Sequence, residues 1–257
     1  MPNADSFIKP IVSLSRRPNS IFLEGLEIKD KGTGRPLILL HGLQSTMDVW
    51  SNVESKLRDC RIVMINMPGR GASNRWKESK GSIEQYYSIE HYVDILHSVI
   101  SQIGDSVALA GWSMGTMVAL KYLEKYSADR VDRLFLLSGV PKVVGYCSTF
   151  QDADVEMIKQ ESKNRQLKNN WMNSADPDAV AYTWMSLVSL DFTKMLGELT
   201  IPTWILHGTK DRECSIQGAR VLCDSIKGAE LKEFPDAGHM LVVEHPEEIA
   251  FLIQENL

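Results

Sequence analysis

In this 257-residue sequence, the strongest indication of chemistry is a serine with one glycine two residues before it and another two residues after it. Residues 111–115 read Gly-Trp-Ser-Met-Gly, with an apolar run before them and a helical pattern after them. Between a strand and a helix, a Gly-x-Ser-x-Gly sequence makes a tight turn that exposes the serine hydroxyl. The alternative is a glycine-rich turn with a structural serine, and the flanking strand and helix argue against it. We therefore predict that Ser113 is a nucleophile.

An aspartate and a histidine follow this serine in the order that a catalytic triad requires when the serine lies between a strand and a helix in this way. Asp211 comes just after the apolar run 203–206, and His239 follows the run 231–234. A serine hydroxyl needs a base that accepts its proton near neutral pH, and histidine is suited to this role. A carboxylate on the other ring nitrogen fixes the tautomer of that histidine. The order serine, acid, histidine therefore predicts His239 as the base and Asp211 as the acid.

Four other histidines and one aspartate compete for these roles and are interpreted as structural. His91 and His97 lie in a helical pattern away from strand ends, and His245 begins the last helix. His207 ends a strand, so we expect it to pack beside the site. Asp236 is close in sequence to the predicted base, but it belongs to a turn.

Two backbone N–H groups are expected to stabilise the negative charge that develops on the substrate oxygen. One belongs to the residue after the nucleophile, Met114, and the other to the loop after the apolar run 36–40. In that loop Leu43 follows His-Gly, and we predict it as the second donor. Gln44 and Ser45 are candidates for polar residues of the pocket, or they begin the next helix.

The elements that must position these residues alternate along the chain between apolar runs and helical patterns. Short apolar runs without polar alternation indicate strands that are covered on both faces. Such alternation predicts a mostly parallel sheet flanked by helices, an α/β fold. The expected strands are 36–40, 61–66, 106–110, 133–137, 203–206 and, at an edge, 231–234; the helices are 89–103, 114–126, 213–226 and 246–256; and 21–30 suits an antiparallel strand or hairpin.

One long stretch, 140–201, interrupts this alternation. It has no strong strand pattern and is rich in Met, Trp, Lys and Asn, so we predict a small helical lid. The core would then consist of residues 1–139 and 202–257. The large apolar residues of the lid either pack it onto the sheet or face the serine. As substrate-binding residues we predict Trp112 in the core and Trp171, Trp184 and Met185 in the lid.

Composition and charge exclude several classes of protein. The chain has 44% hydrophobic and 24% charged residues and a net charge of -5, as soluble globular proteins do. Nothing indicates a nucleic-acid partner, since such proteins carry clustered basic charge. The basic run 159–168 is either a solvated helix face or a docking site for an acidic carrier protein.

The cysteines and the ends of the chain indicate a cytoplasmic protein. Cys60, Cys147, Cys214 and Cys223 match no metal-site spacing and no dense disulfide framework, which suits a reducing compartment. The N-terminus lacks the pattern of a secretory signal, and no run approaches 18 apolar residues. We therefore expect no membrane association, no metal and no cofactor.

Five motifs in this order resemble those of the α/β-hydrolase superfamily, from about residue 32 to the C-terminus. They are His-Gly at 41–42, Met-Pro-Gly-Arg-Gly-Ala-Ser at 67–73, the serine motif, Gly-Thr-Lys-Asp at 208–211 and Gly-His-Met at 238–240. Within the superfamily the sequence is most similar to small bacterial carboxylesterases, such as the pimeloyl-acyl-carrier-protein methyl ester esterases of biotin synthesis. Thr116, where a third glycine is common, departs from that pattern. The resemblance implies that 67–73 is a structural turn and that Arg70 is not catalytic.

The predicted triad and the resemblance lead to an expected function. Dehalogenases and epoxide hydrolases of this fold use an aspartate as the nucleophile, and this sequence has a serine there. We expect hydrolysis of a small carboxylic ester, or of an acyl ester on a carrier protein, through an acyl-enzyme. Thioester hydrolysis and carbon–carbon bond hydrolysis use the same triad and stay open. A different class, a non-catalytic ligand-binding protein with this fold, also stays open.

Overall fold

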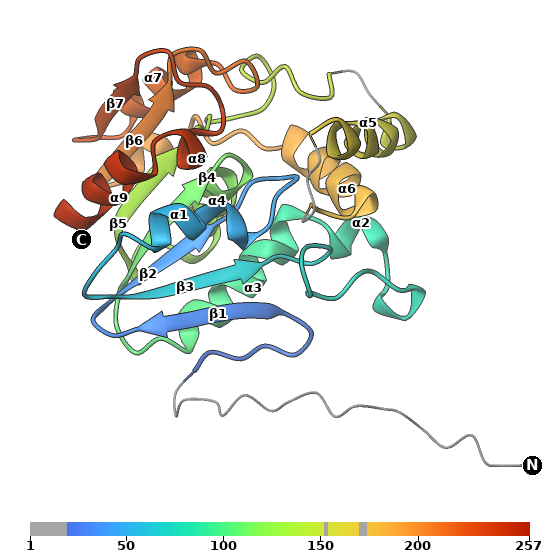
Figure 1. Ribbon diagram of the computed structural model, residues 1–257, viewed down its shortest axis with the longest axis horizontal. Coiled ribbons are helices and arrows are strands. Elements are labelled where there is room, and N and C mark those ends of the chain that lie inside the picture. The colour runs from blue at the N-terminus through green and yellow to red at the C-terminus, as the bar shows by residue number, and fades with distance from the viewer. Residues whose placement is uncertain (1–19, 152–153, 170–173) are drawn as a thin grey trace, which may run out of the picture.

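A seven-stranded sheet forms the centre of the computed structural model, which describes residues 20–151, 154–169 and 174–257 (Figure 1). The strand order is β1-β3-β2-β4-β5-β6-β7. β1 runs antiparallel to β3 and all other neighbours are parallel, so the predicted mostly parallel sheet is confirmed. The strands are β1 (Glu27–Gly32), β2 (Arg35–Leu40), β3 (Cys60–Asn66), β4 (Val107–Trp112), β5 (Val131–Leu137), β6 (Thr203–Gly208) and β7 (Glu230–Phe234).

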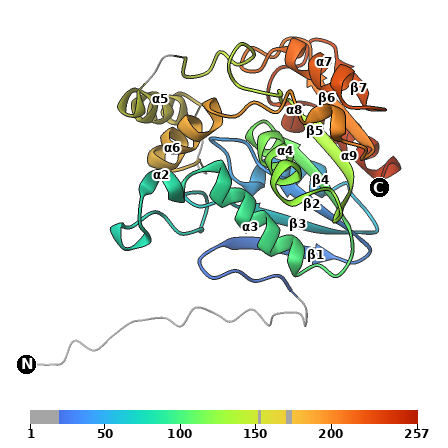
Figure 2. The ribbon, with the colours of Figure 1, turned by 180° about the vertical axis from the view of Figure 1, so that it is seen from behind.

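Helices cover both faces of this sheet, as Figures 1 and 2 show from opposite sides. α3, α4 and α7 pack on one face, and α1, α8 and α9 pack on the other. The helices are α1 (Ser51–Glu54), α2 (Ile83–Tyr86), α3 (Ile89–Ser101), α4 (Met114–Tyr126), α5 (Val155–Lys168), α6 (Pro177–Val188), α7 (Ile216–Ser225), α8 (Leu241–Glu244) and α9 (Pro246–Glu255).

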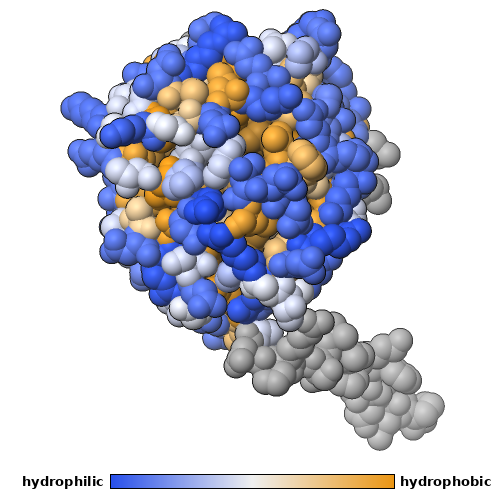
Figure 3. Space-filling view, turned by 90° about the vertical axis from the view of Figure 1, so that its left-hand side faces the viewer, coloured by the Kyte–Doolittle hydropathy of each residue, from blue (hydrophilic) through white to orange (hydrophobic). Residues whose placement is uncertain are grey.

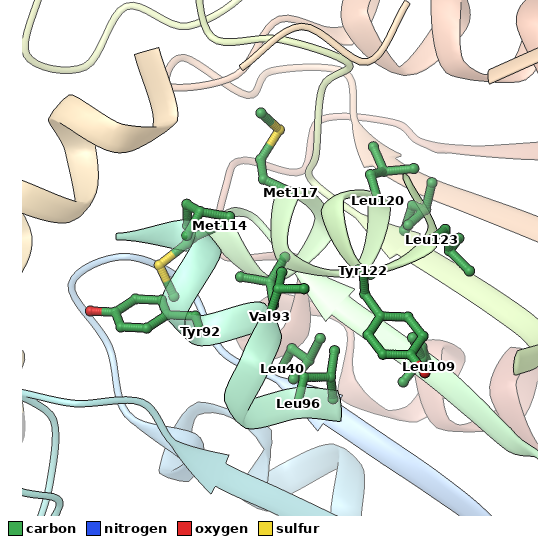
Figure 4. Close-up of a cluster of buried hydrophobic side chains, with 14 of the residues drawn as sticks. Leu40, Tyr92, Val93, Leu96, Leu109, Met114, Met117, Leu120, Tyr122 and Leu123 are labelled. Atoms are coloured by element: carbon green, nitrogen blue, oxygen red, sulfur yellow. The ribbon is translucent and has the colours of Figure 1, made fainter. Parts of the chain in front are cut away.

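Burial on both faces explains why the central strands are continuously apolar. In β2, Leu37 and Leu39 point to the face of α1 and α9, whereas Ile38 and Leu40 point to the face of α3 and α4. Figure 4 shows Leu40 in the hydrophobic cluster on the second face, beside side chains of α3 and α4. Each fully buried leucine contributes about 1.5–3 kcal/mol through the hydrophobic effect. A polar residue at any of these positions would be buried, which explains why polar and apolar residues do not alternate along the strand.

The connection between β5 and β6 carries α5 and α6, which pack against each other away from the sheet faces (Figure 1). α6 begins at Pro177 after an N-cap, Asp176, whose carboxylate accepts from the Asp178 N–H at 2.9 Å. The backbone N–H of Asp176 donates to Gly69 O at 2.8 Å, which ties this helix to the loop after β3. The connection is therefore anchored to loops at the carboxyl edge of the sheet.

The outer surface is mainly hydrophilic on the face shown in Figure 3, with apolar residues visible between the polar ones. Within the described segments, no helix combines the length and apolar character that crossing a lipid bilayer requires.

Candidate active site

Ser113 lies in the turn from β4 to α4 with a backbone φ of +56°. A positive φ is strained for a residue with a side chain, and here the turn requires it. The flanking glycines leave no room for a Cβ. One on Gly111 would lie 2.3 Å from the Gly115 carbonyl oxygen, and one on Gly115 would lie 2.4 Å from the Leu40 oxygen. The motif is therefore required by the close approach of strand and helix.

Thr116 occupies the position where the resemblance leads one to expect glycine. Its side chain is fully buried, and its hydroxyl donates to the Gly111 carbonyl at 3.0 Å. A Cβ built on Gly139 would lie 2.4 Å from both the Oγ1 and the Cγ2 of Thr116. The larger residue on α4 is accommodated because Gly139, after β5, has no side chain.

The structure brings Ser113, His239 and Asp211 together in one row of hydrogen bonds. His239 Nε2 lies 2.9 Å from Ser113 Oγ, and its Nδ1 lies 2.8 Å from Asp211 Oδ2. The three residues follow β4, β7 and β6, so the carboxyl ends of three parallel strands position them. In this arrangement the serine hydroxyl donates to Nε2, and the Nδ1–H donates to the carboxylate.

Asp211 is a fully buried carboxylate that several donors stabilise. Its Oδ1 accepts from the backbone N–H groups of Glu213 at 2.8 Å and Cys214 at 2.9 Å. Burial raises the pKa of this carboxyl, but hydrogen bonds from His207, His239 and the Cys214 N–H outweigh it. The net pKa of Asp211 lies well below the ordinary value, so the group is ionised at neutral pH.

His239 has a raised pKa because its partner carboxylate outweighs its own burial. Burial lowers the pKa of the imidazole, whereas the hydrogen bond to Asp211 and the charges of Asp211 and Glu213 raise it. The charge of Arg165 acts in the opposite direction. The net upward shift means that the imidazolium form is stabilised, as a proton acceptor requires.

His207 lies beneath the acid, fully buried, as the sequence led us to expect. Its Nε2 is 2.9 Å from the Cys214 carbonyl oxygen and 3.3 Å from Asp211 Oδ2. Its Nδ1 has no hydrogen-bond partner within the described part of the chain. The ring therefore carries its proton on Nε2 and helps to hold the loop that bears Asp211.

The other competing residues lie outside this hydrogen-bonded row. Their contacts are structural: His91 Nδ1 lies 2.7 Å from the Tyr86 oxygen, His97 stacks on Tyr126, His245 lies against Phe234, and Asp236 forms an exposed ion pair with Lys210.

A cavity of about 380 Å³ opens in front of Ser113 and His239. Leu43 and Met114 line it. Because Met114 is the first residue of α4, its backbone N–H has no acceptor within the helix. Gln44 and Ser45 line it too, so the loop after β2 contributes several residues to the wall.

Of the four predicted substrate-binding residues, the structure describes three, and two of these line the cavity. Trp112 and Trp184 line the cavity, whereas Met185 is 46% exposed and does not line it. Trp171 lies outside the described residues. Trp112 also has a second contact, since its indole N–H donates to the His239 carbonyl at 2.9 Å. It therefore holds the loop of the base as well as the cavity wall.

Several cavity residues lack any recognisable sequence signal. They are apolar, ionic or thiol side chains from α4, from the β5–β6 connection and from the acid loop: Met117, Val140, Val143, Cys147, Arg165, Leu187, Glu213 and Cys214. Among the described side chains, no three His, Cys, Asp or Glu residues gather in a way that suits a metal ion.

Arg70, in the turn after β3, is fully buried and donates to the loop that carries Leu43. Its Nη2 is 2.9 Å from the Leu43 carbonyl oxygen, and its Nη1 is 2.8 Å from that of Pro68. The Nη1 also donates to the Tyr92 hydroxyl, which lies 2.9 Å from the Thr183 hydroxyl in α6. A continuous buried polar network thus joins the loop after β2 to the β5–β6 connection.

Comparisons with known proteins give relatives of modest identity that match over most of this chain. The AB hydrolase superfamily protein YisY of Bacillus subtilis is 29% identical, covering 90% of this chain and 94% of its own. The pimeloyl-[acyl-carrier protein] methyl ester esterase of Legionella pneumophila (strain Paris) is 24% identical, covering 90% and 98%. Other relatives and neighbours are named as haloperoxidases and as a meta-cleavage product hydrolase.

Among solved structures, an esterase from Exiguobacterium antarcticum superposes with a TM-score of 0.77 at 22% identity, covering 90% of this chain and 94% of that one. This likeness shows the fold. The sequence pattern that describes the alpha/beta hydrolase family matches residues 37–250, which is most of the chain. The predicted resemblance is confirmed, and the protein belongs to the alpha/beta hydrolase family.

Proposed function

We propose that this protein is a serine hydrolase that cleaves carboxylic esters through an acyl-enzyme intermediate. The observation that carries the proposal is the hydrogen-bonded row of Ser113, His239 and Asp211 at the wall of a cavity. A cavity of about 380 Å³ falls within the range of small-molecule sites. The names of the relatives support an ester as substrate, because several are methyl ester esterases.

In the proposed reaction, His239 Nε2 accepts the hydroxyl proton as Ser113 Oγ attacks the ester carbonyl carbon. The N–H groups of Leu43 and Met114 stabilise the negative charge on the carbonyl oxygen. When the tetrahedral intermediate collapses, the alcohol leaves with the proton from His239. A water molecule then attacks the acyl-enzyme with the same base and releases the acid. Throughout, Asp211 keeps the ring oriented and stabilises its cationic form.

The apolar part of the cavity is the proposed acyl site. Val140, Val143 and Leu187 line it, and all three belong to the connection between β5 and β6. We propose that residues 140–201 act as a helical lid over the remaining core, with Trp184 of α6 facing the substrate. Chain-length preference would then depend on this connection rather than on the sheet.

The test combines turnover with covalent labelling. The purified protein is assayed with p-nitrophenyl esters of increasing acyl length and then treated with a fluorophosphonate probe. We expect turnover and a label on the tryptic peptide that contains Ser113. Labelling without ester turnover would favour thioester or carbon–carbon bond hydrolysis, which the matching thioester and a meta-cleavage product would then distinguish. The absence of both labelling and turnover would exclude the hydrolase and favour a ligand-binding protein.

Arg70 offers a test of the oxyanion site that leaves the triad intact. Arg70→Met removes the donor to the Leu43 carbonyl and leaves buried acceptors unpaired, at a cost of about 1–3 kcal/mol in unfolding free energy for each acceptor. Because a small displacement near the reacting atoms is costly, we expect kcat for esters to fall by up to about 100-fold. Esterase kinetics and thermal unfolding measure the two effects.

The matched control is Arg75→Met, because Arg75 is 51% exposed and donates to carbonyls of the same turn. It should retain its kcat. A variant at Arg70 that unfolds at a lower temperature but keeps its full kcat in the folded state would contradict a positioning role.

An acyl chain on a carrier protein is a second, more specific substrate class, and the Legionella relative's name favours it. The basic run lies on α5, where only part of its charge is available. Lys159 pairs with Glu156 at 2.8 Å and with Asp178 at 2.7 Å. Lys163 and Lys168 are exposed on the same helix. We propose these two as the contact for an acidic carrier.

Reversal of both charges tests this contact. Lys163→Glu/Lys168→Glu is expected to lower kcat/KM for an acyl-carrier-protein ester on the order of tenfold, because repulsion slows association. Hydrolysis of a p-nitrophenyl ester should be unchanged. The control Lys77→Glu/Lys80→Glu makes the same charge change on an exposed segment outside α5. An equal loss in both double variants, or on both substrates, would reject the docking site.

A further inference from the structure

Cys147 and Cys214 form a close pair of thiols that the proposed hydrolysis does not use. Their sulfur atoms lie 3.1 Å apart, and both side chains are buried at the cavity wall. Cys147 belongs to the β5–β6 connection, and Cys214 lies three residues after Asp211. The pair therefore joins the connection to the loop that carries the acid of the triad.

The backbone around the two cysteines has the geometry of a short antiparallel bridge. The Ser148 N–H donates to the Glu213 oxygen at 3.0 Å, and the Ser215 N–H donates to the Tyr146 oxygen at 2.8 Å. The cysteines between these bonds form a non-hydrogen-bonded pair, in which Cα atoms lie about 4.5 Å apart and side chains are close. That separation lies within the range of about 4.4–6.8 Å that disulfides span. A shift of about 1 Å in the sulfur positions would complete the bond.

We propose that Cys147 and Cys214 are a redox-active pair that a small peroxide converts to a disulfide, fastening the β5–β6 connection to the acid loop. Hydrogen peroxide oxidises one of the two sulfurs to a sulfenic acid and releases water. The other thiol then attacks the sulfenic sulfur, the S–O bond breaks, and the departing oxygen leaves as a second water with the proton of the attacking thiol. One peroxide and two thiols thus yield one disulfide and two waters.

The surroundings of Cys214 affect how readily its thiol reacts. The hydrogen bond with Cys147, burial and the charge of Asp211 raise the pKa of Cys214 well above the ordinary value. This slows the reaction of Cys214 with peroxide, because the thiolate is the nucleophile. Because both side chains line the cavity, a small peroxide reaches them through the same opening as a substrate.

The bond would constrain the unfolded chain strongly. It would close a loop of 67 residues, and a disulfide across a loop of this size raises Tm by roughly 5–15 °C in a protein of this length. The native geometry needs little change, because the flanking backbone hydrogen bonds already hold the two segments together. The sulfur chemistry does not depend on ester hydrolysis, so either proposal can fail without the other.

The experiment treats the full chain with hydrogen peroxide and maps its peptides without reduction. We expect a linked peptide pair containing Cys147 and Cys214, a mass lower by two hydrogen atoms, and a raised Tm that dithiothreitol reverses. Cys147→Ser should show neither the link nor the rise in Tm. The control Cys60→Ser/Cys223→Ser, which keeps the pair, should show both.

Two results would overturn the proposal. One is recovery of Cys147 and Cys214 as free thiols or sulfinic acids at a peroxide dose that oxidises the partly exposed Cys223. The other is formation of the link without any rise in Tm, which would mean that the bond does not fasten the two segments. Both readouts use the wild-type chain before and after oxidation, so neither depends on a variant that folds poorly.

Discussion

Replacement of Ser113 by alanine is expected to lower kcat for ester hydrolysis by about 10⁴–10⁶-fold. The variant removes the only atom that attacks the carbonyl carbon in the proposed mechanism, and it leaves the oxyanion donors in place. A residual rate above that of water is therefore expected. Single-turnover kinetics with a p-nitrophenyl ester, together with loss of fluorophosphonate labelling, measure the effect.

Ser98→Ala is the matched control, because it removes a hydroxyl that is exposed on α3. Its kcat and labelling should equal those of the wild type. The Ser113 variant should also unfold at a similar temperature, since alanine keeps the Cβ that the strained turn already accommodates. Retention of turnover in folded Ser113→Ala would show that another group is the nucleophile.

Asp211→Asn is expected to lower kcat by about 10⁴-fold while the fold is kept. An amide at this position can no longer accept as a carboxylate from both the His239 ring and the backbone N–H groups of Glu213 and Cys214. The NH₂ of the asparagine can also donate to His239 Nδ1. This favours the tautomer with its proton on Nε2, which cannot accept the serine proton. Asp224→Asn, which changes an exposed carboxylate on α7, should keep its activity.

The pH profile gives a second readout of the same interaction. His239 acts as a base only when it is neutral, and its pKa is raised above 6.5. Activity of the wild type should therefore fall with decreasing pH at a midpoint above 6.5. In Asp211→Asn the hydrogen bond and charge that raise this pKa are lost, whereas burial, which lowers it, is kept. The midpoint should therefore move to lower pH. An unchanged midpoint would show that Asp211 does not raise the pKa of the catalytic base.

The fold could be predicted from local patterns because its central strands are buried on both faces. The run 203–206 marked β6 for this reason, although the strand extends to Gly208 within the motif that follows. β4 likewise extends to Trp112, two residues beyond its apolar run. In both strands the apolar run ends where a motif begins, before the strand pairing ends, so the run alone predicts a strand that is too short.

The cavity wall could be predicted only in part, because it depends on how helices are rotated and on contacts between distant segments. Trp184 and Met185 are consecutive and apolar, yet the first faces the cavity and the second faces solvent. Adjacent helical residues point about 100° apart, and α6 is apolar on too many sides for a period to distinguish them. The contact of Cys147 with Cys214 spans 67 residues, and no local pattern marks it.

The contact between Thr116 and Gly139 has a consequence for how this family can vary. A side chain at one position occupies the space that a Cβ at the other would need, so the two sites share one fixed volume. A relative with glycine at the helix position would have room for alanine after β5, whereas a relative with threonine there would not. Substitutions at these two sites should therefore be correlated in evolution: Gly139→Ala alone should destabilise the fold, and the same change should be tolerated better together with Thr116→Gly.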